Sequence, residues 1–299
     1  MSEPQTRPTN ISRPGWLDHD VWPFDIRSIE VDGKLVAYTD EGEGPTILLV
    51  HDGMWSYIWG QLITELKGEH RVVTLDFPGS GLSPGSDEPA SLAGDSRLLE
   101  AFVDQLDLES LILAVHDLGG SVGLALAVRR PDLFDGLVMI NTFAWPPHVA
   151  SLERMFKIIT SRPVKALNVA TNLVPRLTSG SFGIGANLDS KQRRAFLGGF
   201  ADHGLRRRFH DLIGAARDER DFLAQTEAGL GTVLRDKPTL TIYGEQNDPF
   251  GFQAKFRSYF NDIDEMVIPN GNHFPMADDP SGVAVRIRTW QREWSSKAA

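Results

Sequence analysis

The chain has 299 residues, 41% of them hydrophobic, and a formal net charge of −10 at pH 7. This length suits one large α/β domain or two small ones, and the negative charge argues against nucleic acid or an anionic membrane surface as a partner. There is no cysteine, which excludes disulfides, thiolate metal sites and a cysteine nucleophile.

The first elements in chain order are an arm and a hairpin. Residues 1–25 are rich in proline and polar side chains and predict an extended arm over the surface. They lack the apolar segment of an export signal, so we expect a cytoplasmic protein. Two strands joined by Asp32-Gly33 follow, at residues 26–31 and 34–38. No apolar stretch reaches the about 20 residues that cross a bilayer, so no membrane partner is expected.

Strands and helices then alternate. Short apolar runs predict buried strands at residues 46–50, 72–75, 111–115 and 136–140. Helical spacing of apolar residues predicts helices at residues 59–66, 92–106 and 119–130. This alternation indicates an α/β fold with a mostly parallel central sheet and helices on both faces.

The alternation stops after residue 146. Helical patterns at residues 152–160, 191–200 and 209–216, with a Gly/Ser loop at 179–185, continue without a strand to residue 234. Strands resume at residues 239–243 and 265–268, and a helix at 283–294 ends the fold. An all-helical insertion of this length is too long for an idle loop. We therefore expect a helical lid over 147–234 on a core formed by 26–146 and 235–299.

The turn after the strand at residues 111–115 carries the first candidate for chemistry. It reads His116-Asp117-Leu118-Gly119-Gly120 and leads directly into a helix. A strand that enters a helix through a sharp glycine-rich turn is typical of a nucleophile elbow, and the residue at its tip is Asp117. The structural alternative is an aspartate that caps the helix, which is compatible with the same position.

Ser121 offers a competing reading. Residues 119–123 match the string G-x-S-x-G, but that motif needs its serine directly after a strand. Ser121 lies four residues beyond Asp117, within the first helical turn. We therefore favour Asp117 over Ser121 as the nucleophile.

Partners for Asp117 are expected after later strands, first an acid and then a histidine. Asp248 lies in the loop after residues 239–243, and Glu245 is its rival but sits close to the strand end. His273 follows the last strand on a glycine turn and is the candidate base. His116 and His51 are interpreted as structural.

An oxyanion hole normally combines the amide after the nucleophile with one from the loop after the third strand. The first would be the amide of Leu118, and the second that of Asp52 or Gly53. The cluster Arg206-Arg207-Arg208 is interpreted as a solvated helix face rather than an anion site.

Five motifs in order carry a resemblance: VHDGMWSYIW, LDFPGSGLS, VHDLGGSVGLALA, RRPDLFDGLVMINT and GNHFPMADDP. Together they resemble the haloalkane dehalogenase branch of the α/β-hydrolase superfamily over about residues 27–146 and 235–297. The resemblance implies the α/β-hydrolase fold, with Asp117 as nucleophile, His273 as base and Asp248 as acid. It implies a cofactor-free and metal-free hydrolase that forms an alkyl-enzyme ester with small apolar halogenated compounds.

The chain departs from that pattern beside the nucleophile. Dehalogenases of this type commonly have a tryptophan there, and this chain has Leu118, so Trp55 and Asn141 are the candidate substrate-pocket residues. Related epoxide hydrolases have catalytic tyrosines in the lid, whereas the four tyrosines of this chain all lie outside it. Epoxide or ester hydrolysis on the same scaffold, or a non-catalytic protein that binds a small molecule, are the alternatives. Monomer and homodimer both remain open.

Overall fold

The computed structural model describes residues 9–85, 88–180 and 183–298. Within these residues one sheet contains nine strands in the order β1-β2-β3-β5-β4-β6-β7-β8-β9. The strands are β1 (Thr9–Asn10), β2 (Arg27–Val31), β3 (Lys34–Glu41), β4 (Thr46–Asp52), β5 (Arg71–Asp76), β6 (Leu111–Asp117), β7 (Phe134–Thr142), β8 (Thr239–Gly244) and β9 (Ile263–Ile268).

The direction of these strands confirms the predicted fold class. β1, β2 and β3 are antiparallel, and every pairing from β5 to β9 is parallel. The register of β4 against β6 pairs His51 with His116 and Asp52 with Asp117. Because the carboxyl ends of parallel strands meet at one edge, this register brings the loop after β4 beside the turn after β6.

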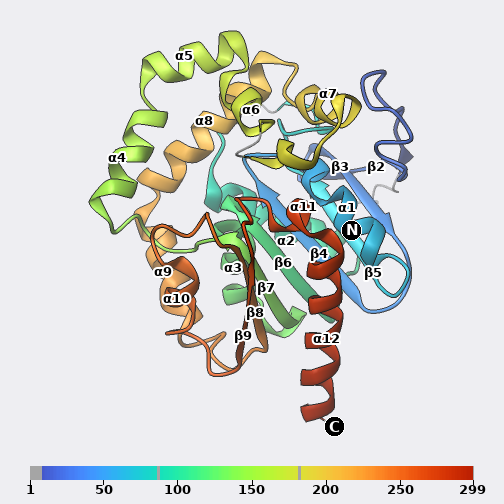
Figure 1. Ribbon diagram of the computed structural model, residues 1–299, viewed down its shortest axis with the longest axis vertical. Coiled ribbons are helices and arrows are strands. Elements are labelled where there is room, and N and C mark those ends of the chain that lie inside the picture. Colours follow the sequence, from blue (N-terminus) through green and yellow to red (C-terminus); the bar gives the residue numbers. More distant parts are fainter. Residues whose placement is uncertain (1–8, 86–87, 181–182, 299) are drawn as a thin grey trace, which may run out of the picture.

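Helices cover the sheet on both faces (Figure 1). On one face α1 (Gly60–Leu66) contacts α12 (Pro280–Ala298) and α11 (Pro275–Asp278). On the other, α3 (Leu118–Arg129) packs between α2 (Leu92–Gln105) and α9 (Arg220–Leu230) and contacts strands β4, β6 and β7. The short helices η1 (Ser56–Trp59), η2 (Pro131–Leu133) and α10 (Phe252–Phe256) complete the core.

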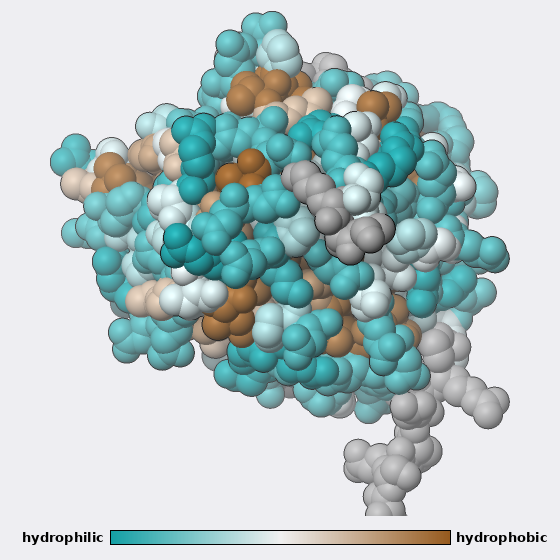
Figure 2. Space-filling view, turned by 90° about the horizontal axis from the view of Figure 1, so that it is seen from below, coloured by the Kyte–Doolittle hydropathy of each residue, from teal (hydrophilic) through white to brown (hydrophobic). Residues whose placement is uncertain are grey.

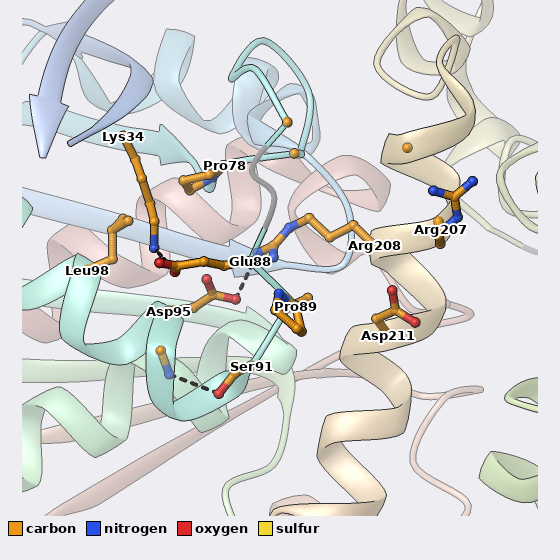
Figure 3. Close-up of a pocket in the computed structure, with 15 residues that line it drawn as sticks. Lys34, Pro78, Glu88, Pro89, Ser91, Asp95, Leu98, Arg207, Arg208 and Asp211 are labelled. Carbon is orange, nitrogen blue, oxygen red and sulfur yellow. Dashed lines mark hydrogen bonds and ion pairs between the residues drawn. The ribbon is translucent and has the colours of Figure 1, made fainter. Parts of the chain in front are cut away.

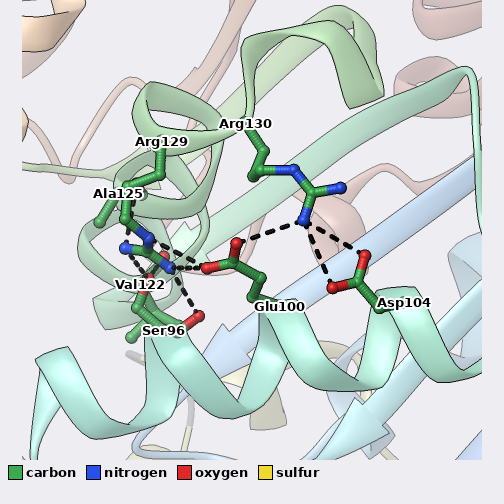
Figure 4. Close-up of polar contacts among 7 residues, drawn as sticks. All are labelled: Ser96, Glu100, Asp104, Val122, Ala125, Arg129 and Arg130. Carbon is green, nitrogen blue, oxygen red and sulfur yellow. Dashed lines mark hydrogen bonds and ion pairs between the residues drawn. The ribbon is translucent and has the colours of Figure 1, made fainter.

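Arginines at the end of α3 fasten it to α2 (Figure 4). Arg129 donates to Glu100 Oε2 at 2.8 Å and to the Ser96 carbonyl at 3.1 Å, and Arg130 pairs with Glu100 and Asp104 at 3.3 Å. Each exposed pair contributes little alone, but the group shares Glu100 as a common partner. These bonds fix the helix whose first turn follows Asp117.

The segment between β7 and β8 is helical, as predicted. It contains α4 (Ala150–Ile159), α5 (Arg162–Thr171), α6 (Leu173–Thr178), η3 (Ile184–Asn187), α7 (Ser190–Gly198) and α8 (His203–Asp218), followed by α9. Figure 1 shows α4 to α8 above one edge of the sheet. The patterns at 152–160, 191–200 and 209–216 correspond to α4, α7 and α8, whereas α5, α6 and α9 were not predicted.

The N-terminal arm differs from the expected surface segment. Leu17, Trp22 and Phe24 are at most 1% exposed and belong to the hydrophobic core. The Arg13 guanidinium donates to the carbonyl oxygens of Trp22 and Phe24. The arm is therefore packed into the core at these residues. Its first eight residues, and residues 181–182 of the predicted loop, lie outside the described residues.

One face of the molecule is mostly polar. Figure 2 shows a face dominated by hydrophilic side chains, with hydrophobic ones in separate small patches. In the described part of the chain, no helix has the length and apolar character needed to cross a membrane.

Candidate active site

Asp117 lies at the turn from β6 to α3 with φ 49° and ψ −128°, a backbone conformation that is costly for a residue with a side chain. Thr142 Oγ1 donates to the Asp117 carbonyl at 2.6 Å and holds the turn. A Cβ at Gly119 would overlap the Val50 carbonyl, and one at Gly120 would overlap Thr142 Oγ1. The glycines are thus required for the sharp turn that presents the Asp117 carboxylate.

His273 faces this carboxylate. Its Nε2 lies 3.6 Å from Asp117 Oδ2, and the two side chains are 29% and 27% exposed. Burial opposes ionisation of Asp117, but attraction to His273 in its protonated form outweighs it, so the pKa of Asp117 lies below its ordinary value. The structure therefore brings together an ionised carboxylate and an imidazole from the two predicted positions.

His116 contacts the backbone of His273. It is fully buried, and its Nε2 pairs with the His273 carbonyl at 2.8 Å. Burial, followed by the charge of His273, lowers the pKa of His116 to about 3. A neutral imidazole next to a carbonyl donates its N–H to that oxygen. This contact agrees with the interpretation of His116 as a structural residue.

The acid position differs from the sequence expectation. The Asp248 carboxylate accepts hydrogen bonds from the amides of Phe252 at 2.7 Å and Gln253 at 3.0 Å, in the first turn of α10. The partner of His273 Nδ1 is instead Asn247 Oδ1, at 2.9 Å. Asn247 precedes Asp248 in a tight turn closed by its own amide on the Gly244 carbonyl, so the two side chains have different partners. Asn247 was not predicted from the sequence because its side chain does not ionise, whereas an acid was expected at this position.

The candidate oxyanion amides of Leu118 and Gly53 lie close to the apolar side chains of Leu118 and Phe209. Leu118 begins α3, where the first amides of a helix lack intrahelical partners. The Gly53 amide already donates to Asp52 Oδ1 at 2.9 Å. A Cβ on Gly53 would lie 3.6 Å from the Leu118 side chain and 3.7 Å from Phe209 of α8. The Leu118 amide is therefore a better candidate than the Gly53 amide to donate to an oxyanion.

The two expected pocket residues have structural partners. The Trp55 indole N–H donates to the Phe196 carbonyl of α7 at 2.9 Å. Asn141 Nδ2 donates to the Asn272 carbonyl at 2.9 Å, and Asn141 Oδ1 accepts from the Gly244 amide at 3.0 Å. These groups are engaged inside the protein, so the expectation that they supply donors to the substrate is corrected.

Ser121 is also engaged. It is fully buried, and its hydroxyl donates to the Phe143 carbonyl at 3.0 Å. This position in α3 agrees with the rejection of Ser121 as the nucleophile.

The arginine cluster is not the solvated face that the sequence suggested. Arg206 donates to the carbonyls of Phe200 and Val169, and Arg208 pairs with Asp95 at 2.8 Å and with Asp52 at 3.3 Å. Only Arg207 of the three is exposed. The acidic partners of Arg208 lie on α2 and at the end of β4, which composition alone does not reveal.

A cavity of about 400 Å³ adjoins Arg208, between α8 and α2 (Figure 3). Asp117 and His273 are not among the residues that line it. Burial, and then the nearby Asp95, raises the pKa of Asp52 well above its ordinary value. In the part of the chain that the structure describes, no group of three or more histidine and acidic side chains is arranged to hold a metal ion.

Comparison with known proteins identifies a family and several relatives. The model described as "Alpha/beta hydrolase family" matches residues 47–286. Haloalkane dehalogenase 2 of Mycobacterium tuberculosis is 28% identical over 285 residues, which cover 90% of this chain and 96% of that protein. Cis-3-alkyl-4-alkyloxetan-2-one decarboxylase of Shewanella oneidensis is 34% identical over 131 residues, which cover 41% of this chain and 40% of that protein.

Solved structures share the fold. A loop variant of the haloalkane dehalogenase DbeA from Bradyrhizobium elkanii superposes with a TM-score of 0.80 at 20% identity, covering 91% of this chain and 98% of that one. A putative ancestral haloalkane dehalogenase gives a TM-score of 0.79 at 21% identity, covering 90% and 99%.

Proposed function

Because this chain belongs to the alpha/beta hydrolase family, we propose that it is a haloalkane dehalogenase-like hydrolase with Asp117 as nucleophile and His273 as base. The observation that carries the proposal is the Asp117 carboxylate, held at a strained turn with His273 Nε2 3.6 Å away. The similarity to proteins named haloalkane dehalogenase supports small, apolar halogenated compounds as the substrate class.

The proposed reaction has two steps. An oxygen of Asp117 attacks the carbon that bears the halogen, so a C–O ester bond forms while the carbon–halogen bond breaks and the halide leaves with the bonding electrons. His273 Nε2 then removes a proton from water, and the resulting hydroxide attacks the ester carbonyl of Asp117. The Leu118 amide is the proposed donor to the oxyanion. Collapse releases the alcohol and restores the carboxylate, so that one proton and one halide are produced.

The site offers little help to the departing halide. The side chain after the nucleophile is Leu118, which has no hydrogen-bond donor. The neighbouring Gly53 and Phe209 are also apolar. Since bromide leaves carbon more readily than chloride, we expect brominated alkanes to be turned over faster than their chlorinated counterparts.

The test combines a substrate panel with a trapping variant. Halide release is measured for 1-bromobutane, 1-chlorobutane and 1,2-dibromoethane, alongside an epoxide and a simple ester. Asp117→Ala should abolish turnover, because no nucleophile remains. His273→Gln should form the ester but not hydrolyse it, and mass spectrometry should show the added alkyl group on the peptide that contains Asp117. Full turnover by Asp117→Ala would exclude the mechanism.

A second candidate is ring opening of a strained cyclic ester. The relative named cis-3-alkyl-4-alkyloxetan-2-one decarboxylase is 34% identical over its matched segment, and this similarity supports an oxetan-2-one as a second substrate class. In such a ring, attack by Asp117 on the ring carbon bonded to the ester oxygen would release a carboxylate that stays attached to the alkyl group. Consumption of a cis-3,4-dialkyl-oxetan-2-one without halide release from the panel would favour this candidate.

A non-catalytic role is the remaining alternative. Tight binding of a small apolar molecule without turnover, and with no change in affinity in Asp117→Asn, would favour it.

We also propose that the lid, residues 147–234, covers the site, because Phe209 of α8 lies within contact range of a Cβ placed on Gly53.

A further inference from the structure

His273 has two ring nitrogens, and the one that faces away from Asp117 has an amide partner. We infer that two asparagines, Asn247 and Asn141, position His273 and hold its proton on Nδ1, in the place where a carboxylate acid was expected. The inference rests on the proposed function for the role of His273 as a base, but the contacts that carry it do not depend on any substrate.

The orientation of the Asn141 amide is fixed by the backbone on both sides. Its oxygen accepts from the Gly244 amide at 3.0 Å, and its nitrogen donates to the Asn272 carbonyl at 2.9 Å. A backbone N–H can only donate and a carbonyl can only accept, so exchanging the oxygen and nitrogen of Asn141 would lose both bonds. Asn141 is also 5% exposed, which leaves little access for water to replace them.

The orientation of Asn247 follows from that of Asn141. Besides the Asn272 carbonyl, the Asn141 nitrogen has a second hydrogen-bond partner, the side-chain oxygen of Asn247 at 3.3 Å. Since the Asn141 group is a donor, the atom of Asn247 that faces it is an acceptor. The same oxygen lies 2.9 Å from His273 Nδ1. An oxygen acceptor requires Nδ1 to carry a proton, so in the neutral ring Nε2 has the free lone pair.

The free lone pair is on the side where the proposed chemistry needs it. Nε2 is the ring nitrogen 3.6 Å from Asp117 Oδ2. The backbone at His273 is fixed as well, because its carbonyl is bonded to His116 Nε2 at 2.8 Å. Asn247 is therefore a positioning residue that acts through the imidazole and has no contact with the reacting carbon.

An amide differs from a carboxylate in one consequential respect. It sets the tautomer and the ring orientation, but it carries no negative charge to stabilise the imidazolium. The charged or titratable groups near His273 are Asp117, His116 and Asp278, whose carboxylate accepts from the Asn272 amide. Asp117 loses its charge when it is alkylated, and the Asn247 amide at Nδ1 is neutral, so the imidazolium formed during ester hydrolysis has no ionised hydrogen-bond partner.

The tautomer of His273 can be measured directly. The protein is prepared with ¹⁵N-labelled histidine, and long-range ¹H–¹⁵N NMR spectra are recorded over a range of pH, with His273→Gln used to assign the signals. In the parent protein the neutral ring should carry its proton on Nδ1. In Asn247→Ala both tautomers should be present in comparable amounts. In Asn247→Asp the doubly protonated ring should persist to a higher pH, because a carboxylate stabilises it.

Asp248→Asn is the matched control, since it removes the neighbouring acid and keeps the shape of the side chain. It should leave the signals of His273 unchanged. The inference is overturned if the parent ring carries its proton on Nε2, or if Asp248→Asn changes the tautomer or titration of His273 while Asn247→Ala does not. Thermal unfolding of each variant establishes that it is folded, and the near-isosteric Asn247→Asp keeps the test decisive if Asn247→Ala does not fold. No substrate enters this experiment, so its failure is distinct from failure of the proposed function.

Discussion

Leu118 directly follows the strained Asp117 and is buried at 3% exposure close to Gly53 and Phe209. The Asp117 carboxylate therefore faces His273 on one side, while Leu118, Gly53 and Phe209 form apolar surroundings on the other. Charge that develops on a leaving group in such a place is poorly stabilised unless an N–H or O–H points at it. In the proposed reaction, Leu118 would thus limit which electrophiles react well.

A donor introduced at this position should improve halide release. Leu118→Trp adds an indole N–H next to the nucleophile, and we expect the rate of halide release from 1-chlorobutane to rise about 10-fold or more, since one well-aimed donor is worth at least that much. Leu118→Phe is the control, because it adds a ring without a donor. An equal gain in both variants would assign the effect to shape rather than to the hydrogen bond.

His116 makes a pH-dependent contribution to stability. Its pKa is lowered to about 3 in the folded protein from an ordinary value of 6.5, so the unfolded chain binds the additional proton at intermediate pH. The contribution is present above pH 6.5 and is lost as the pH falls toward 3. In His116→Asn the free energy of unfolding, measured by urea denaturation, should depend less on pH in this window. His19→Asn, at an exposed position, should keep the dependence of the parent protein.

At the scale of elements, a buried arginine joins the helical insertion to the core through two acidic side chains. Arg208 on α8 is 11% exposed in its side chain and pairs with Asp95 on α2 and Asp52 at the end of β4. Asp52 also accepts from the Gly53 amide, beside the turn that carries Asp117. The same contact therefore positions α8 and constrains the loop after β4.

Removing Arg208 should be costly because the buried Asp95 carboxylate would lose its cation and Asp52 would lose a hydrogen-bond donor. We expect Arg208→Ala to lower the free energy of unfolding by about 3–5 kcal/mol, the usual consequence of breaking a buried pair from one side. Chemical denaturation measures the change. Arg207→Ala is the matched control on the same helix, and because that side chain is exposed its effect should stay within about 0.5 kcal/mol. Similar losses in the two variants would contradict the role assigned to Arg208.

At the scale of the whole molecule, the segment before the sheet is part of the core. Trp22 is fully buried, with its ring centroid 4.9 Å from that of Phe24 and 6.2 Å from that of Trp55. Trp55 in turn donates to the Phe196 carbonyl in α7. The arm, the loop after β4 and the helical insertion thus meet in one aromatic cluster.

Truncating this cluster should destabilise the protein as a whole. Trp22→Ala removes a large buried side chain, for which a loss of about 3–5 kcal/mol in the free energy of unfolding is expected. Thermal or urea denaturation measures it. Leu35→Ala provides the comparison, since Leu35 is 43% exposed and should change stability by no more than about 0.5 kcal/mol. A small effect at Trp22 would contradict the role of the arm in the core.

Local pattern was sufficient for the parts of the fold that depend on neighbours in sequence. Apolar runs between turn residues predicted the parallel strands, because strands buried on both faces need continuous apolar side chains. Asp117 and His273 were found by their place directly after strands, since parallel strands deliver their carboxyl ends to one edge. Helices α5 and α6 were not predicted, and in the structure both bury few apolar residues.

Tertiary contacts decided which of two adjacent residues has a given partner. Asn247 and Asp248 are adjacent in the chain, yet the first contacts His273 and the second caps α10. Arg207 and Arg208 are likewise adjacent, yet one is exposed and the other is paired with Asp95. The partners of such side chains come from distant segments, and which side chain meets them depends on a rotation of the backbone that composition and spacing do not encode. The sequence by itself therefore determined the fold and the facing pair of Asp117 and His273, and only the tertiary structure decided which neighbour orients the histidine.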